Sequence, residues 1–235
     1  IKFKKKIVIQ NKVIEYNKCF IVAEISANHC GKFSTMKSLI LKLKKAGADA
    51  IKIQAYETST ITIDSKKKDF RIKKNNTWAK YNTLFSLYKT AQTPFSWYPK
   101  IFNFCKKNKI IVFASVFDEK SLSILEKLKC PAYKIASPEI TDIPLISTVS
   151  KTKKPIIISN GLASESDLKL AINTVKKQKN PNLVVLKCTS SYPAAINEIN
   201  LLTMKDINKK YKTLVGYSDH TNGYQISINA ASLGA

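Results

Sequence analysis

The stretch from Thr35 to Ala55, TMKSLILKLKKAGADAIKIQA, decides the fold class, because it predicts a helix followed closely by a buried strand. Its first part, Thr35–Ala46, has the apolar spacing of a helix. Its last part, Ala50–Ala55, is short and largely apolar, which is typical of a parallel strand covered on both faces. Lys52 and Gln54 lie two residues apart, so both are expected on one face of that strand.

The same pairing of helix and strand recurs along the chain. The predicted strands are Phe20–Ile25, Ala50–Ala55, Ile110–Ser115, Ala132–Ser137, Pro155–Ser159, Leu183–Cys188 and Thr213–Tyr217. The predicted helices are Thr35–Ala46, Glu119–Leu128, Ile143–Ser150, Glu165–Lys177, Met204–Lys209 and Tyr224–Leu233. Ser164 is the expected N-cap of the fourth of these helices. The longer connection from Glu57 to Lys107 is expected to hold additional loop and helix. Such strict alternation predicts either a barrel or a doubly wound sheet.

The choice between these two folds favours the barrel. No GxGxxG or GxxxxGK motif follows any predicted strand, so the usual nucleotide-binding signatures of an open sheet are missing from the sequence. We therefore predict an α/β fold, a TIM (β/α)8 barrel that lacks its eighth strand in this sequence. An N-terminal β-hairpin is predicted over 1–18, and the incomplete barrel over 19–235. Because the sequence starts at Ile1 and stops at Ala235 without a polar ending, we interpret it as part of a longer protein.

The amino-acid composition limits which kinds of molecule the protein is expected to bind. The net charge is +24, but of 40 Lys and Arg residues only Arg71 is arginine, so we expect no nucleic-acid partner. The charge should instead favour small anionic substrates. No apolar run reaches the roughly 18 residues that a membrane span needs, so no membrane partner is expected. Five cysteines without a CxxC pair suit a reducing compartment and predict a cytoplasmic location. Cys130 and Cys188 are interpreted as packing residues.

Charged and hydroxyl side chains fall where the predicted strands end, as reacting groups do in barrel enzymes. Glu24, Lys52 and Lys134 need partners, because an unpaired charge in an apolar strand is costly. Together with Ser115, Ser137, Ser190 and Ser218, the two lysines would form a pocket for phosphate and carboxylate groups. Two alternatives stay open from the residues alone. The lysines could pair with carboxylates for structure only, or Lys134, Lys52 or Lys187 could form a Schiff base as in aldolases.

The sequence leaves the roles of the two histidines open. His220, beside Asp219 at a predicted strand end, could be a metal ligand, a general base or a structural loop residue. His29 lies in the loop after the first strand of the predicted barrel, where a substrate contact and a plain loop role are equally open.

Five stretches of the sequence resemble the sialic acid synthase family, in the family's order and at its spacing. They are Ala23–His29 (AEISANH), Ala46–Gln54 (AGADAIKIQ), Tyr133–Ser137 (YKIAS), Lys187–Pro193 (KCTSSYP) and Gly216–Thr221 (GYSDHT). Within the family, the connection after the second barrel strand resembles the pseudaminic acid synthase branch. That second likeness rests on Thr60–Asp64, Asp69-Phe70, Thr77-Trp78, Leu84–Lys89, Thr93-Pro94, Trp97 and Ser26–His29.

The resemblance implies an enzyme, a transferase of the alkyl-transferring class that forms a carbon–carbon bond. It would condense phosphoenolpyruvate with 2,4-diacetamido-2,4,6-trideoxy-altrose and water, giving pseudaminic acid and phosphate, with a divalent metal (Mn²⁺, Co²⁺ or Mg²⁺) as Lewis acid. The implied phosphoenolpyruvate ligands are Lys52, Ser115, Lys134, Ser137, Ser190 and Ser218. Glu24 and Glu139 match catalytic carboxylates, Gln54 and Tyr192 match sugar contacts, and His220 matches one metal ligand, with a second histidine beyond Ala235.

The resemblance also implies parts that this sequence lacks and a setting for the reaction. A C-terminal antifreeze-like SAF domain and a homodimer are expected in the complete protein, and residues 1–235 alone are expected to be inactive. The product would serve carbohydrate biosynthesis such as flagellin glycosylation. Val116 and Asn160 depart from the family's usual residues, proline and Ser or Thr. The alternatives are an N-acetylneuraminate or legionaminate synthase that uses a mannosamine-type sugar, or a non-catalytic sugar- or phosphate-binding barrel.

Overall fold

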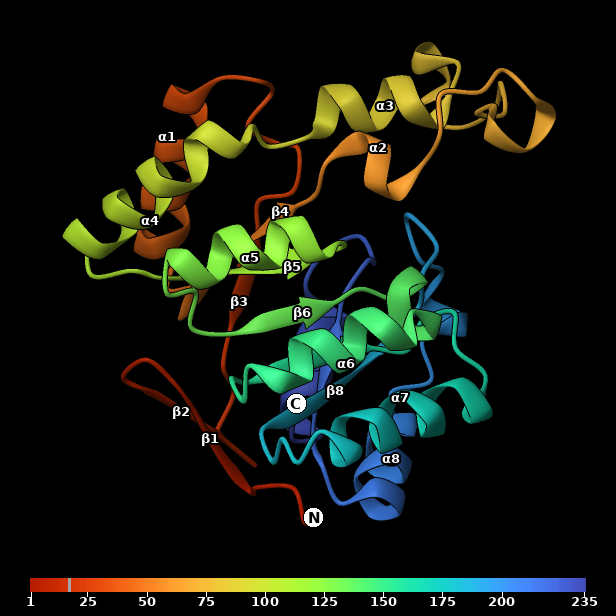
Figure 1. Ribbon diagram of the computed structural model, residues 1–235. Coiled ribbons are helices and arrows are strands. Elements are labelled where there is room, and N and C mark those ends of the chain that lie inside the picture. The colour runs from red at the N-terminus through yellow and green to blue at the C-terminus, as the bar shows by residue number, and fades with distance from the viewer. Residues whose placement is uncertain (17) are drawn as a thin grey trace. The chain divides into compact units, whose positions relative to one another are not determined.

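The computed structural model describes residues 1–16 and 18–235, which form two compact units (Figure 1). One unit is Val22–Cys130, and the other combines Ile1–Ile21 with Pro131–Ala235. Asn17, inside the predicted hairpin segment 1–18, lies outside the described residues.

The unit Val22–Cys130 is built on three parallel strands in the order β3-β4-β5. The strands are β3 (Val22–Glu24), β4 (Ala50–Ala55) and β5 (Ile111–Val116). Its helices are α1 (Phe33–Lys45), α2 (Thr58–Ile61), α3 (Leu84–Ala91), α4 (Tyr98–Lys107) and α5 (Glu119–Lys127). Short 3₁₀ turns lie at Lys68–Phe70, Ala79–Tyr81 and Phe95–Trp97. The long connection after β4 therefore holds additional helices, as predicted.

The second unit contains the N-terminal hairpin and four parallel strands in the order β6-β7-β8-β9. The hairpin pairs β1 (Lys6–Ile9) with β2 (Lys12–Glu15), and the parallel strands are β6 (Tyr133–Ile135), β7 (Ile156–Ser159), β8 (Leu183–Cys188) and β9 (Leu214–Ser218). The helices are α6 (Ile143–Lys151), α7 (Glu165–Lys177), α8 (Thr203–Tyr211) and α9 (Gln225–Ser232), with 3₁₀ turns at Pro138–Thr141 and Ile196–Glu198.

The strands consist largely of apolar residues because both of their faces are buried. All six side chains of β5 are buried, as are all four of β7, because helices cover the strands and leave no solvent face. In β4, only Lys52 and Gln54 are half-buried among buried neighbours. Their spacing of two places both on one face, as predicted.

The hairpin lies at the amino ends of the strands in its unit. The Lys4 N–H donates to the Pro181 carbonyl just before β8, at 2.9 Å, and the Lys176 ammonium sits over the Phe3 ring. Ile7 and Ile9 are buried. The opposite ends of these strands, where the predicted site residues lie, are not covered by the hairpin.

Two predicted strands are too long. The strand predicted over Ala132–Ser137 ends at Ile135, because Ser137 has helical backbone angles (φ −59°, ψ −39°) and leads into the 3₁₀ turn at Pro138. The strand predicted over Phe20–Ile25 is shorter as well, and the left-handed φ of Ser26 (+49°) turns the chain directly after it. Helix α7 was predicted correctly, and Ser164 and Asp167 form the capping box at its start.

No helix among residues 1–16 and 18–235 combines the length and apolar character needed to cross a bilayer.

Candidate active site

Lys52 lies at the centre of a polar cluster in the unit Val22–Cys130. It pairs in register with Glu24 on the neighbouring strand, and the two side chains form an ion pair. On its other side, the Lys52 ammonium donates to the Ser115 hydroxyl at 3.2 Å. Only 17% of the Lys52 side chain is exposed, so these partners stabilise its charge where water is largely excluded.

The turn after β3 orients Glu24. The Ser26 N–H donates to Oε1 of Glu24 at 2.9 Å, while Oε2 faces Lys52. The Ser26 hydroxyl reaches toward Oε1 of Gln54 at 3.4 Å, which brings Gln54 into the same group. We call Glu24, Ser26, Lys52, Gln54 and Ser115 the Lys52 cluster. It combines a carboxylate, an ammonium and hydroxyls at the carboxyl ends of three neighbouring strands.

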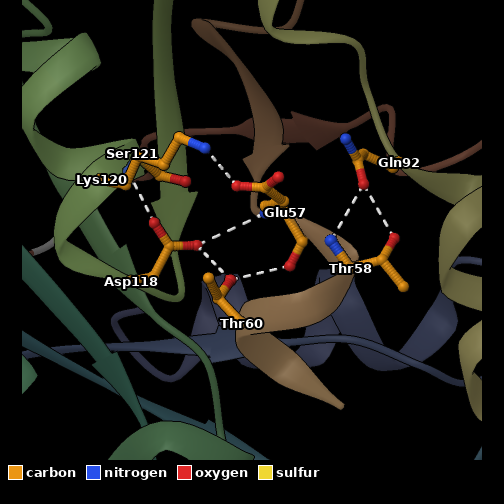
Figure 2. Close-up of polar contacts among 7 residues, drawn as sticks. All are labelled: Glu57, Thr58, Thr60, Gln92, Asp118, Lys120 and Ser121. Atoms are coloured by element: carbon orange, nitrogen blue, oxygen red, sulfur yellow. Dashed lines mark hydrogen bonds and ion pairs between the residues drawn. The ribbon is translucent and has the colours of Figure 1, made fainter. Parts of the chain in front are cut away.

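A second layer of polar contacts, shown in Figure 2, holds the loops that follow β4 and β5. Asp118 caps α5 through the Ser121 N–H at 2.6 Å, and its other oxygen accepts from the Thr60 hydroxyl at 2.6 Å. The Lys120 ammonium pairs with Glu57 at the start of α2. These contacts fix the beginning of the long connection against the end of β5.

The far end of that connection is tied back by Gln92. Its Oε1 accepts from both the N–H and the hydroxyl of Thr58, at 3.0 and 2.8 Å (Figure 2). The segment between Thr58 and Gln92 is thus closed at its base by side-chain hydrogen bonds, and sequence reasoning predicted neither contact.

The position and contacts of His29 are those of a buried structural residue. It is fully buried, its Nδ1 accepts from the Gly31 N–H at 3.1 Å, and its Nε2 contacts the Thr93 hydroxyl at 3.3 Å. The ring also packs edge-on against Trp97. Burial lowers the pKa of His29, which favours the neutral form of the ring. Of the two roles left open by the sequence, these contacts support the structural one.

Lys134 lies at the centre of a separate polar cluster, in the unit that contains Pro131–Ala235. The side chain is 5% exposed, and its ammonium donates to the Ile135 carbonyl at 3.1 Å. Burial lowers the pKa of Lys134 to about 8, although Cys188 and Glu139 attract the charge. Burial also raises the pKa of Glu139 to about 7. Oε2 of Glu139 is buried and has no hydrogen-bond partner among the described residues.

Hydroxyl groups from three strand ends accompany Lys134. Ser137 accepts from the Gly161 N–H at 3.0 Å, and Ser218 pairs in register with Cys188 at the ends of β9 and β8. The buried Ser190 hydroxyl has no partner in the described part of the chain. We call Lys134, Ser137, Glu139, Cys188, Ser190, Ser218 and His220 the Lys134 cluster. A buried cation among hydroxyls with unused hydrogen-bonding capacity can bind an oxyanion.

His220 is oriented by the loop after β8. Its Nδ1 lies 2.7 Å from the Thr189 carbonyl, an arrangement in which Nδ1 carries the proton. Nε2 is then the nitrogen with the lone pair, and the Tyr192 hydroxyl donates to it at 2.8 Å, with the two rings stacked. Burial pulls the pKa of His220 down, but contacts with Cys188 and the Thr189 carbonyl outweigh it, so the pKa is raised.

This geometry fits one ligand of a metal site. A carbonyl that holds Nδ1–H fixes the tautomer and leaves the lone pair on Nε2, which is the usual support of a metal-binding histidine; a metal there would replace the hydrogen bond from the Tyr192 hydroxyl. In residues 1–16 and 18–235, no group of three or more His, Cys, Asp or Glu side chains is placed to hold a metal. His220 is therefore compatible with a metal site whose other ligands lie elsewhere.

Cys188 and Ser159 are features that sequence reasoning did not assign to the site. The Cys188 thiol is buried, as expected of a packing residue, but its sulfur also lies 3.8 Å from Nδ1 of His220. Burial raises the thiol pKa, yet contacts with His220, Ser137 and Ser218 outweigh it and leave the pKa lowered. Ser159 ends β7, and its buried hydroxyl has no partner among the described residues. Its position at a strand end was the available signal.

Glu139→Gln is expected to stabilise the protein in a pH-dependent manner. A carboxyl whose pKa is about 7 when folded and 4.5 otherwise binds its proton more tightly in the folded state. The free energy of unfolding therefore falls as pH rises from about 4.5 to 7, and the glutamine variant escapes this loss. Urea unfolding at pH 8 should show the variant more stable by ~1–2 kcal/mol. At pH 4 the two proteins should be nearly equal, and an equal gain at both pH values would contradict the burial argument.

Comparison with known proteins agrees with this architecture. The NeuB family model matches residues 39–235, so the chain belongs to the NeuB family. Over 93% of its length it is 42% identical to a pseudaminic acid synthase of Campylobacter jejuni, and over 92% it is 40% identical to that of Helicobacter pylori. It is 34% identical to an N,N'-diacetyllegionaminic acid synthase of Campylobacter jejuni over 93% of the chain and 65% of that protein. The chain spans 63% of the length of either pseudaminic acid synthase.

A solved structure confirms the predicted fold class. The crystal structure of N-acetylneuraminic acid (sialic acid) synthetase from Leptospira borgpetersenii, in complex with citrate, matches the whole chain with a TM-score of 0.87 at 30% identity, covering 76% of that protein. The chain therefore has the α/β barrel fold of this class, with seven parallel strands and an N-terminal hairpin in its described residues.

Proposed function

We propose that the complete protein condenses phosphoenolpyruvate with 2,4-diacetamido-2,4,6-trideoxy-altrose and water, giving pseudaminic acid and phosphate. The observation that carries the proposal is Lys134, a lysine 5% exposed among hydroxyls and a carboxyl at strand ends. Such a charge is costly unless it meets an anion. The similarity to pseudaminic acid synthases supports phosphoenolpyruvate as that anion and the diacetamido-altrose as the sugar.

The proposed roles follow the two clusters. In the Lys52 cluster, Lys52 and Ser115 bind phosphoenolpyruvate, Glu24 is a catalytic carboxylate, and Gln54 contacts the sugar. In the Lys134 cluster, phosphoenolpyruvate is bound by Lys134, Ser137, Ser190 and Ser218. Glu139 is the second catalytic carboxylate. His220 binds the metal, and Tyr192 beside it contacts the sugar. These roles extend the sequence predictions, and the geometry within each unit supports them.

The reaction needs charge stabilisation and proton movement. C3 of phosphoenolpyruvate attacks the aldehyde carbon of the open-chain sugar, water adds at C2, and the C2–O bond to phosphate breaks. The lysines neutralise the phosphate and carboxylate groups of the substrate. A carboxyl whose pKa is about 7, as in Glu139, can both give and take a proton near neutral pH. Glu24 keeps its position through Ser26 and is suited to orienting the attacking water.

The metal would act as a Lewis acid on the aldehyde oxygen. His220→Ala is expected to weaken Mn²⁺ binding about 10–100-fold or more, because a ligand whose orientation is fixed by the Thr189 carbonyl is lost. Calorimetric titration with Mn²⁺ measures this without any substrate. Tyr192→Phe, which removes only the hydroxyl that contacts Nε2, is the matched control and should bind Mn²⁺ no more weakly than the wild type. Equal affinities of the histidine variant and the wild type would remove His220 from the metal site.

Product analysis tests the proposed reaction. The product of the complete gene, incubated with phosphoenolpyruvate and the diacetamido-altrose, should yield a nine-carbon 2-keto acid by mass spectrometry. Formation of pyruvate alone would show hydrolysis and contradict the proposal. Binding of phosphoenolpyruvate without any product would favour the non-catalytic binding barrel.

The second candidate is a legionaminate or N-acetylneuraminate synthase, favoured by the 34% identity to the legionaminic acid enzyme. The long connection after β4, closed at its base by Gln92, is the segment proposed to choose the sugar. Exchanging residues 57–107 for those of a legionaminic acid synthase should shift the preference toward the mannosamine-type sugar. An unchanged preference would remove this segment from sugar selection.

Other features stay predictions from the cysteine pattern, for the location, and from the resemblance, for the rest. They are the C-terminal SAF domain, the homodimer, the cytoplasmic location, the use of the product in flagellin glycosylation and the inactivity of residues 1–235 alone. Turnover by a purified 1–235 fragment would contradict the last of them.

A further inference from the structure

The turn after β7 brings Gly161 against side chains from two other strand ends of the same unit. The Gly161 N–H donates to the Ser137 hydroxyl oxygen at 3.0 Å. This bond uses a lone pair of the oxygen, so Ser137 can still donate its hydroxyl hydrogen, either to the neighbouring Cys188 sulfur or to a bound anion. A backbone donor in this position therefore sets the direction in which Ser137 can donate.

Gly161 also lacks room for a side chain. A Cβ atom built on it would lie 2.3 Å from Oγ of Ser190 and 2.9 Å from Oγ of Ser137, with Sγ of Cys188 at 3.2 Å. The φ angle of Gly161 is not in the left-handed region, in contrast to Gly31, Gly47, Gly223 and Gly234. The glycine is therefore required here for space around two hydroxyls and not for backbone conformation.

Asn160 fixes the turn in this place. Its N–H donates to the Leu186 carbonyl at 3.1 Å, and its side-chain Oδ1 accepts from the Cys188 N–H at 3.2 Å. Both contacts are to β8, the strand that leads into Ser190. The turn cannot move away from Ser190 without breaking them, so a side chain at position 161 would have to displace the Ser190 hydroxyl.

We propose that Gly161 is a positioning residue of the phosphoenolpyruvate site, whose N–H orients the Ser137 hydroxyl and whose missing side chain leaves space for that of Ser190. The inference rests on the proposed function, in which both serines bind phosphoenolpyruvate. It adds the residue that keeps their hydroxyls in a binding arrangement.

Gly161→Ala is the direct test. The Ser190 hydroxyl can rotate away from the added methyl group, so the variant should fold, with a melting temperature within about 3 °C of the wild type. Phosphoenolpyruvate binding, measured by calorimetry on the complete gene product, should weaken about 10-fold, as expected for the loss of one hydrogen bond to a charged group. Unchanged affinity would overturn the proposal.

A double-mutant cycle separates positioning from a general effect of the methyl group. Ser190→Ala removes the atom that lies 2.3 Å from the added Cβ. In that background, Gly161→Ala should cost less than about threefold in affinity, because neighbouring residues that act through one another are not additive. An equal loss in both backgrounds would show that Gly161 does not act through Ser190.

Gly216→Ala is the matched control. The added Cβ would meet the Leu186 side chain at 2.8 Å in the buried strand β9, so the variant should have a lower melting temperature with little change in phosphoenolpyruvate affinity.

Failure of the proposed function can be recognised separately from failure of the Gly161 proposal. If the wild type binds inorganic phosphate but not phosphoenolpyruvate, the proposed function fails, and the same cycle run with inorganic phosphate still tests Gly161. Binding of neither anion would overturn both.

Discussion

Replacing Lys134 by methionine is expected to weaken phosphoenolpyruvate binding by about 10–150-fold, the range that corresponds to losing one charged hydrogen bond. Lys134 is 5% exposed, and burial lowers its pKa to about 8. Because the folded state pays a penalty for this charge, the methionine variant should be at least as stable as the wild type toward urea. A combination of lost binding with retained stability identifies a lysine that serves a ligand.

Two controls sharpen this result. Lys169→Met changes an exposed lysine on α7 in the same unit and should leave affinity unchanged. Borohydride reduction in the presence of substrate should leave Lys134 without a covalent adduct, because an anion-binding lysine forms no imine. A trapped adduct on Lys134 would establish the Schiff-base alternative. Unfolding of Lys134→Met without ligand would show that the lysine has a structural role.

Glu24→Gln is expected to lower turnover by about 10²–10⁴-fold, the usual contribution of a group that moves a proton or orients water. Phosphoenolpyruvate affinity should be equal to or higher than that of the wild type, because the amide no longer neutralises Lys52. The substitution keeps the shape of the side chain and the contact of Oε1 with Ser26. Stopped turnover with retained binding therefore distinguishes a catalytic carboxylate from a purely structural ion pair.

Glu15→Gln provides the comparison for Glu24. Glu15 also pairs with a lysine, Lys6, at 2.7 Å, but this pair lies on the hairpin and belongs to neither polar cluster. The turnover of the Glu15→Gln variant should equal that of the wild type. If both variants lost activity to the same extent, the loss would reflect removal of an ion pair and not of a catalytic group. If Glu24→Gln kept full activity, its assignment would be wrong.

The helices and strands were largely predictable because burial on both faces leaves a plain apolar signal. β4 and β8 have the predicted bounds, and α7 begins after its capping serine as expected. The ends of several other helices were harder to predict. Glycine usually takes the left-handed residue after a helix. After four of these other helices in residues 1–16 and 18–235 a lysine takes it instead, namely Lys109, Lys129, Lys153 and Lys212, as Lys179 also does after α7. These positions carry no recognisable stop signal in a sequence so rich in lysine.

For the candidate site, the strand-end rule predicted which residues carry the polar groups but not how they contact one another. It placed Lys52 and Ser115 at neighbouring strand ends, and the structure joins them at 3.2 Å. It gave no sign that the Cys188 sulfur lies beside His220 or that Gly161 packs against Ser190. Those contacts depend on the paths of turns, which local sequence patterns do not determine.

The most direct test of the central claim is phosphate release from phosphoenolpyruvate by the product of the complete gene. The diacetamido-altrose and N-acetylmannosamine are compared, each with Mn²⁺ and with a chelator. We predict rapid release only with the altrose sugar and Mn²⁺, and none with chelator. Release only with the mannosamine would keep the mechanism and change the sugar. No release with either sugar, from a folded protein supplied with Mn²⁺, would contradict the proposed synthase.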